Sequence, residues 1–200
     1  MNKPDPAESA RRLEALRLKP GDIAIDCGAN VGHVTAILAR SGATVYAFEP
    51  NPHAFEVLQK RFASTPSVVC LRKGVLDEAG AMKLYLHQNA GQDQVYWSQG
   101  GSLLDFKGNV NRETFVEVEI VDLADFILKL GRPVRVLKMD VEGVECRILK
   151  RLILLGLAER IEHIFVETHE QKIPQLRPEV EELRDLIGAR GLKNIDLNWL

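Results

Sequence analysis

The stretch IAIDCGANVGHVT, residues 23–35, constrains the fold more than any other part of the chain. Its apolar start predicts a buried strand, and the glycines at 28 and 32 predict a tight loop that leads into a helix. This order of strand, glycine loop and helix is typical of α/β proteins that bind a nucleotide-like ligand. The stretch therefore predicts a ligand site at the carboxyl end of the first strand.

The rest of the chain alternates between short β-branched runs and segments with helical spacing. Core strands are expected at residues 23–26, 44–48, 67–71, 134–139 and 163–168, with further strands at 82–86, 115–121 and after Gly191. Helices are expected at residues 31–40, 54–62, 145–155 and 178–190. The core strands are almost continuously apolar, which indicates a sheet covered on both faces. We predict an α/β fold with a mostly parallel, doubly wound sheet and helices on both faces.

Two segments lie outside this alternation. Residues 1–20 predict an N-terminal helical extension of a single domain that spans residues 1–200. Residues 88–112 are rich in Gly, Asn, Gln and Ser and carry Tyr96 and Trp97. A loop of this length in a compact domain is often a lid or a binding loop, so this segment is a candidate lid or substrate loop, with a solvated excursion as the alternative.

Composition excludes several classes of protein. The chain is 46% hydrophobic and 27% charged with a net charge of -2, which excludes a disordered chain and a strongly basic nucleic-acid binder. No apolar run approaches the roughly 20 residues that span a membrane, and the charged N-terminus is unlike a secretory signal. A cytoplasmic protein is expected, with no membrane or nucleic-acid partner. Three widely spaced cysteines predict reduced thiols rather than disulfides or a zinc site.

The charge beside the glycine loop selects among cofactors. A dinucleotide site usually shows a GxGxxG pattern, whereas this loop has Gly28 and Gly32 and is preceded by Asp26. A carboxylate there would repel a diphosphate but attract the ammonium and sulfonium of S-adenosylmethionine. Glu49 follows the second strand, where an acidic group binds a ribose diol, a requirement that NAD shares.

Two later stretches add ionisable groups to the same sheet edge. VLKMDVEGVE places Lys138, Asp140 and Glu142 just after a strand, while Glu145 is expected in the first turn of the next helix. HIFVETHE ends with Glu167 and His169 on one face of an extended segment. No compact ligand spacing supports a metal site formed by these groups with Asp140, so none is predicted. Substrate contact and solvated loop residues both remain open interpretations.

Together these stretches resemble the FkbM family of S-adenosylmethionine-dependent methyltransferases. The resemblance rests on the D-x-G-A-N-x-G loop at residues 26–32, Glu49, the K-x-D-x-E-G-x-E segment at 138–145 and a V-E-x-H strand end at 166–169, and it covers roughly residues 20–198. It implies a Rossmann-like class I methyltransferase fold and O-methylation of a small molecule, often a sugar or a natural-product intermediate. The family's fold usually closes with an antiparallel seventh strand, which the sequence does not show.

The resemblance also assigns roles to residues. It implies that S-adenosylmethionine is bound at its methionine end by Asp26, Gly28, Asn30 and Gly32 and at its ribose by Glu49. The segment from Val75 to Asp77 would border its adenine.

The sequence leaves three groups as candidates for the residue that takes the proton of the acceptor hydroxyl. They are Asp140, Glu142 and His169. A nicotinamide-dependent oxidoreductase and a non-catalytic cofactor-binding module are the alternative functions. The oligomeric state is left open, with a homodimer as one option.

Overall fold

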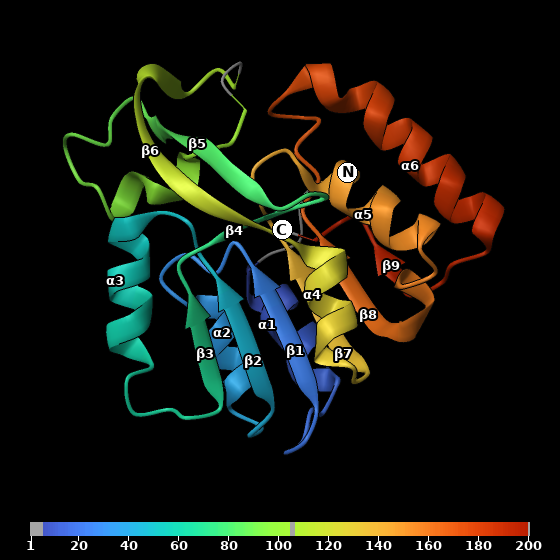
Figure 1. The fold of residues 1–200 in the computed structure, drawn as a ribbon. Helices are drawn as coiled ribbons and strands as arrows, with labels where there is room; N and C mark the ends of the chain where they lie inside the picture. Colours follow the sequence, from blue (N-terminus) through green and yellow to red (C-terminus); the bar gives the residue numbers. More distant parts are fainter. Residues whose placement is uncertain (1–5, 105–106, 200) are drawn as a thin grey trace.

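The structure, a computed structural model, describes residues 6–104 and 107–199 (Figure 1). Its central sheet has six strands in the order β3-β2-β1-β7-β8-β9, and every neighbouring pair is parallel. The strands are β1 Ile23–Cys27, β2 Thr44–Phe48, β3 Val68–Leu71, β7 Val134–Met139, β8 Ile161–Val166 and β9 Ile195–Asp196. The predicted parallel sheet is therefore confirmed.

The strand order reverses between β1 and β7. β1 pairs with β2 on one side and with β7 on the other, so the two halves of the sheet grow outward from this pair. Just beyond the two strands, the amide of Asp140 donates to the carbonyl of Cys27 over 3.1 Å. In open α/β sheets the ligand site lies beyond the carboxyl ends of the strands at such a reversal.

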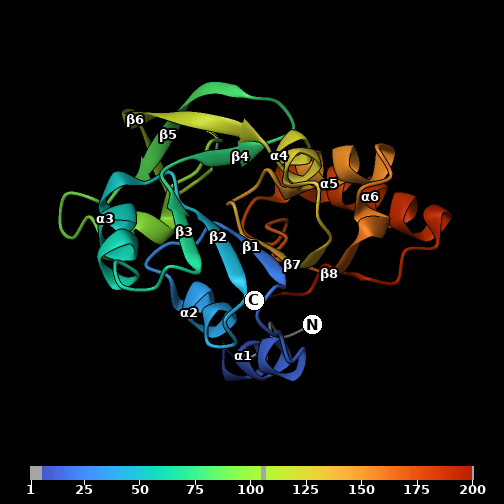
Figure 2. The ribbon, with the colours of Figure 1, turned by 60° about the horizontal axis from the view of Figure 1, so that its bottom comes forward.

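Helices cover both faces of this sheet, as predicted. Ile23 and Ile25 of β1 belong to the largest core cluster, together with residues of α4 and α5, whereas Ala24 packs on the other face with Leu13 and Leu38. Figure 2 shows α1 and α2 on one side of the sheet and α4, α5 and α6 on the other. The helices are α1 Pro6–Ala15, α2 His33–Ala39, α3 Pro52–Arg61, α4 Leu123–Leu130, α5 Glu145–Leu154 and α6 Arg177–Arg190.

A second sheet of three strands lies at one end of the central sheet (Figure 1). Its strands, in the order β4-β6-β5, are β4 Gly74–Leu76, β5 Gly80–His87 and β6 Val110–Asp122. β5 and β6 contain the two strands predicted at 82–86 and 115–121 and pair antiparallel. This hairpin matters for function because Leu84 of β5 contributes to the wall of the cavity described below.

Several features differ from the prediction or extend it. The sequence did not predict α4, because β6 runs into it without a break, and only the side chain of Asp122, which accepts from the amides of Ala124 and Asp125, marks its start. The last strand is also shorter than predicted, since only Ile195–Asp196 pairs as a strand. The N-terminal helix is confirmed over Pro6–Ala15.

The structure also bears on the cysteines, on membrane-spanning helices and on the candidate lid. All three cysteines are free thiols, as predicted. Within the described ranges, no helix combines the length and apolar character needed to cross a membrane. The candidate lid at residues 88–112 contains a short 3-10 helix, Tyr96–Gly100, and its residues 105–106 lie outside the described chain.

Candidate active site

A cavity of about 80 Å³ lies at the strand reversal. Gly28 and Asn30 after β1, Glu49 after β2, and Asp140 and Glu142 after β7 all line it. A roof is formed by residues 98–104, which we call the covering segment and which contribute Ser98, Gly101, Ser102 and Leu103 to the wall. Ligand pockets usually hold about 300–1,000 Å³. The covering segment therefore leaves only a small space above the residues that follow the strand ends, and these residues form the floor of the cavity.

The glycine loop brings the backbone close to β7. Gly28 has a φ of 75°, and a Cβ placed on it would lie 1.8 Å from the carbonyl oxygen of Asp140. Its amide and that of Ala29 donate to the carbonyl of Phe48, which fixes the loop against β2. Gly32 has a φ of 83°, and a Cβ on it would lie 2.5 Å from the Phe62 ring. Gly32 thus serves the packing of α3 and does not line the cavity.

Glu49 is buried at the cavity wall and is held by two backbone amides. Asn30 N donates to Oε2 over 2.7 Å, and Asn51 N donates to Oε1 over 2.8 Å. Burial raises the pKa of Glu49 to about 7, although both amide hydrogen bonds act in the opposite direction. Each oxygen keeps a free lone pair, so this carboxylate can accept the two hydrogen bonds of a ribose diol.

The side chain of Asp26 lies behind the cavity wall, and its contact with the methionine end of the cofactor stays a prediction. This side chain is fully buried, accepts a hydrogen bond from Thr35 Oγ1 over 2.6 Å, and lies 3.3 Å from Lys138 Nζ. Lys138 also donates to the carbonyl of Gly28 over 2.9 Å and lies 3.8 Å from Asp140. Burial lowers the pKa of Lys138, but Asp26 and Asp140 outweigh it and raise the pKa. Asp26 therefore supports the loop through Lys138.

Asp140 and Glu142 form the acidic end of the cavity. Burial raises the pKa of Asp140 to about 7, against the lowering effect of Lys138. Burial also acts to raise the pKa of Glu142, but His169 and Lys107 outweigh it and lower the pKa to about 2. Glu142 has a φ of 61°, a left-handed conformation that is strained for a residue with a side chain. The loop after β7 thus holds two carboxylates in very different electrostatic surroundings.

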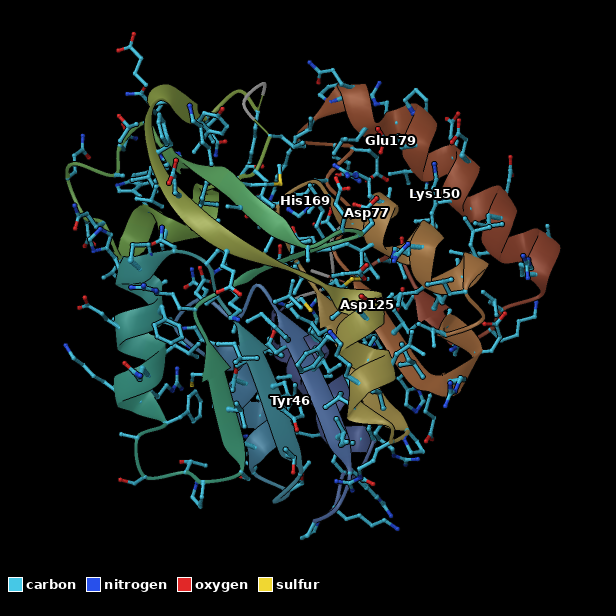
Figure 3. All side chains as sticks on the ribbon, viewed as in Figure 1. Tyr46, Asp77, Asp125, Lys150, His169 and Glu179 are labelled. Carbon is cyan, nitrogen blue, oxygen red and sulfur yellow. The ribbon has the colours of Figure 1, made fainter. Side chains whose placement is uncertain are left out.

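His169 lies among these carboxylates but does not line the cavity. Its Nδ1 is 3.0 Å from Glu145 Oε1, and its Nε2 is 3.3 Å from Glu142 Oε2 and 3.6 Å from Asp140 Oδ1. Burial lowers the pKa of His169, but the carboxylates of Glu142 and Glu145 outweigh it and raise the pKa to about 10. Figure 3 places His169 in the interior of the protein. The ring of His169 therefore lies beneath the acidic end, in contact with three of its carboxylates.

Asp77, predicted from the resemblance to border the adenine, does not line the cavity. Its carboxylate lies 2.7 Å from Arg147 of α5, and Figure 3 shows it beside that helix. Val75 faces the cavity, whereas the chain turns toward α5 after Leu76 and carries Asp77 away from the wall. Val75 and Gly74 are therefore the lining residues of this segment.

Sequence reasoning missed the contacts made by the covering segment. Asn30 Nδ2 donates to Ser98 Oγ over 2.9 Å, and Ser102 Oγ donates to the carbonyl of Glu142 over 2.7 Å. The buried Lys107 is ion-paired with Glu142 and donates to the carbonyl of Gly100 over 3.0 Å. A serine or lysine in a polar loop carries no signal of such a role in the sequence.

The predicted position of Glu145 in the first turn of a helix is confirmed, and its side chain is also buried beside His169. One of its carboxylate oxygens accepts from the amides of Val141 over 2.9 Å and Gly143 over 3.2 Å. It therefore fixes the loop that carries Glu142.

The chain also matches a known protein family over most of its length. A family model described as the methyltransferase FkbM domain matches residues 26–193. The chain belongs to this family. The resemblance drawn from the sequence motifs is confirmed, and the cofactor of this methyltransferase domain is S-adenosylmethionine. The nicotinamide alternative is accordingly set aside.

Two curated relatives extend this match. The hexuronic acid methyltransferase AglP of Haloferax volcanii is 27% identical over 159 residues, which cover 79% of this chain and 60% of AglP. The 31-O-demethyl-FK506 methyltransferase FkbM of Streptomyces tacrolimicus is 27% identical over 199 residues, which cover 88% of this chain and 70% of that protein. The chain thus spans less than two thirds of AglP.

A solved structure supports the fold alone. An rRNA methylase from Streptococcus thermophilus matches with a TM-score of 0.50 and 13% identity, covering 90% of this chain and 81% of that chain. The Rossmann-like class I methyltransferase fold is confirmed.

The cavity suits the charge of S-adenosylmethionine. Of the residues that line it in the described chain, Glu49, Asp140 and Glu142 are acidic and Lys73 is basic, and Lys73 lies 2.6 Å from Glu119. A cationic ligand is favoured in such surroundings, and a diphosphate is not. The binding roles of Gly28, Asn30 and Glu49 stay predictions, with positions at the wall that fit them.

Proposed function

We propose that this chain methylates a hydroxyl group of a small molecule. The observation that carries the proposal is that Glu49, at the ribose end, and Asp140 and Glu142, at the acidic end, line one continuous cavity. When bound, S-adenosylmethionine supplies a methyl group attached to a positively charged sulfur. The sulfur becomes a neutral thioether when the bond to this methyl group breaks. Gly28, Asn30 and Glu49 hold this cofactor, and the two carboxylates at the other end face the acceptor.

A hydroxyl must lose its proton as its oxygen bonds to the methyl carbon. Asp140 and Glu142 are the carboxylates at the acidic end of the cavity wall that can take this proton. His169 lies outside the cavity and holds the two carboxylates in position through its Nε2. The covering segment excludes water, so positioning of the acceptor supplies much of the catalysis. The names of AglP and FkbM favour acceptors with a sugar acid or a natural-product alcohol.

The test has two stages. Calorimetric titration with S-adenosylhomocysteine and NAD checks the cofactor, and binding of the former alone is expected. A panel of hexuronic acids, macrolide alcohols and ribosomal RNA is then screened for S-adenosylhomocysteine formation.

We expect turnover with a hydroxyl acceptor. Asp140→Asn and Glu142→Gln should lower it by a factor of at least 100 while cofactor binding is retained. Turnover on RNA alone, or cofactor binding without turnover on any acceptor, would contradict the proposal and favour the nucleic-acid or the non-catalytic alternative.

A further inference from the structure

Three side chains behind the acidic end of the cavity converge on one point. Asp140, Glu145 and His169 each offer one ligand atom, and these atoms lie within 4.8 Å of one another. Two ligands of one ion with bonds of about 2.1 Å lie about 3 Å apart at right angles and about 4.2 Å apart across the ion. The 4.8 Å spread is slightly wider than this, so small side-chain movements would bring the three ligand atoms onto a single cation.

Unpartnered atoms in this cluster point to a ligand. The side chain of His169 is 0% exposed, and neither ring nitrogen has a hydrogen-bond partner of acceptable geometry within the described chain. The same holds for Oδ1 of Asp140. Buried polar atoms in folded proteins are normally satisfied, and an absent ion is one of the explanations for those that are not.

The charges around His169 leave room for a divalent cation. Five carboxylates crowd the region, namely those of Asp26, Asp140, Glu142, Glu145 and Glu167. Three ammonium groups lie against them, namely those of Lys107, Lys138 and Lys172. Among the described side chains in this cluster, the carboxylates outnumber the lysines by two. A cation bound there would take the place of the proton that Glu142 and Glu145 stabilise on His169.

One ligand is already fixed in place. Both oxygens of Glu145 accept from the amide of Gly143, and Oε1 also accepts from that of Val141. Outer contacts of this kind orient the ligands of metal sites and strengthen binding. Because the Glu145 side chain is already held in place, less side-chain conformational entropy is lost when an ion binds.

We propose that Asp140, Glu145 and His169 bind a divalent cation. One imidazole and two carboxylates suit a first-row ion such as Mn²⁺, since imidazole favours transition metals and carboxylates favour hard cations. The sequence predicted no metal because the three ligands follow no compact spacing. The strand ends β7 and β8 bring them together only in the folded chain.

Asp140 connects this ion to the cavity, because it is the member of the three that also lines the wall. The ion's role in catalysis rests on the proposed function. An acceptor hydroxyl bound to the ion would lose its proton more readily, and Glu142 is the cavity carboxylate left to take it.

The test is titration of the full chain with Mn²⁺, without cofactor or acceptor, followed by calorimetry and by the electron paramagnetic resonance signal of free Mn²⁺. One ion per chain is expected to bind. Asp140→Asn and His169→Gln should each weaken binding at least 10-fold, as loss of a ligand does. Glu170→Gln is the matched control, because this acid pairs with Arg184 outside the cluster and should bind Mn²⁺ like the wild type.

Circular dichroism checks that each variant folds, and Asp140→Asn keeps the test decisive because its side chain is partly exposed. Absence of binding to the wild type for Mn²⁺, Mg²⁺ and Zn²⁺ would overturn the proposal, as would unchanged binding in Asp140→Asn. Titration of the same wild-type sample with S-adenosylhomocysteine separates the two hypotheses. Retained cofactor binding without metal binding rejects the cation site and leaves the proposed function standing.

Discussion

The two ends of the cavity are built in different ways. At the ribose end, backbone groups set the geometry: Gly28 lies against the carbonyl of Asp140, and Glu49 is held by two amides. At the acidic end, side-chain charges set it, with Glu142 held between His169 and Lys107. The first end is fixed by local chain geometry, whereas the second depends on charges from distant segments that must balance one another.

The largest expected effect comes from Lys138, which joins the two ends. Lys138→Met leaves Asp26 buried without its cation and should lower the free energy of unfolding by about 3–5 kcal/mol. Urea denaturation followed by circular dichroism measures this loss. Lys150→Met is the control, because Lys150 forms an exposed pair with Glu182 and should cost less than about 1 kcal/mol. Equal losses in both variants would show that the ends are not joined through this lysine.

A single methyl group should break the ribose end. Gly28→Ala places a Cβ 1.8 Å from a carbonyl oxygen at a φ of 75°, and we expect a loss of about 3 kcal/mol of stability. Binding of S-adenosylhomocysteine should fall in parallel, as measured by calorimetry. Gly80→Ala is the matched control, since nothing lies within 4 Å of a Cβ there. If Gly28→Ala behaved like Gly80→Ala, backbone contact would not define this end.

The charge network at the acidic end should respond to Lys107. Lys107→Met removes the ammonium group that pairs with Glu142 and the hydrogen bond that Lys107 donates to the carbonyl of Gly100. The free energy of local opening of residues 98–104 should therefore fall by about 2 kcal/mol. Hydrogen exchange measured by mass spectrometry would show faster exchange there and unchanged exchange in β1. Lys83→Met, which removes an ammonium lying over the exposed Phe115 ring, is the control. Uniform acceleration in both regions would contradict a division between the two ends.

The smallest effect concerns pH at the ribose end. Burial raises the pKa of Glu49 to about 7, while the charge of Lys138 lowers this pKa and that of Asp26 raises it. Ribose hydroxyls donate to the ionised form, so S-adenosylhomocysteine should bind about 10-fold more tightly at pH 8 than at pH 6. Calorimetry at the two pH values tests this, and Glu49→Gln should bind weakly at both. An unchanged affinity between pH 6 and pH 8 in the wild type would show that Glu49 does not hold the ribose.

The sequence predicted the ribose end because the signals there are local. A strand followed by Gly28, Asn30 and Gly32 has few conformations open to it, and Glu49 follows the next strand in the same way. The parallel sheet followed from apolar runs with short connections. Even here the burial of the Asp26 side chain was not predicted, because burial in the layer beside α2 depends on packing that spacing does not encode.

The acidic end was predicted only as a group of charged residues. The sequence identified Asp140, Glu142 and His169 as candidates. Which of them faces the cavity, and how its pKa is shifted, depends on the neighbours that each side chain contacts. Lys107 and Glu145 decide this through contacts between segments far apart in the chain. The strained backbone of Glu142 likewise has no signature in the sequence, since positive φ is normally associated with glycine.

The covering segment has a consequence for the rate of turnover. It is tied through Ser98 to the glycine loop and through Ser102 to the carbonyl of Glu142. Both hydrogen bonds would have to break for this segment to move away from the cavity floor. In many enzymes the movement of such a segment, and not the chemical step, limits the rate of turnover.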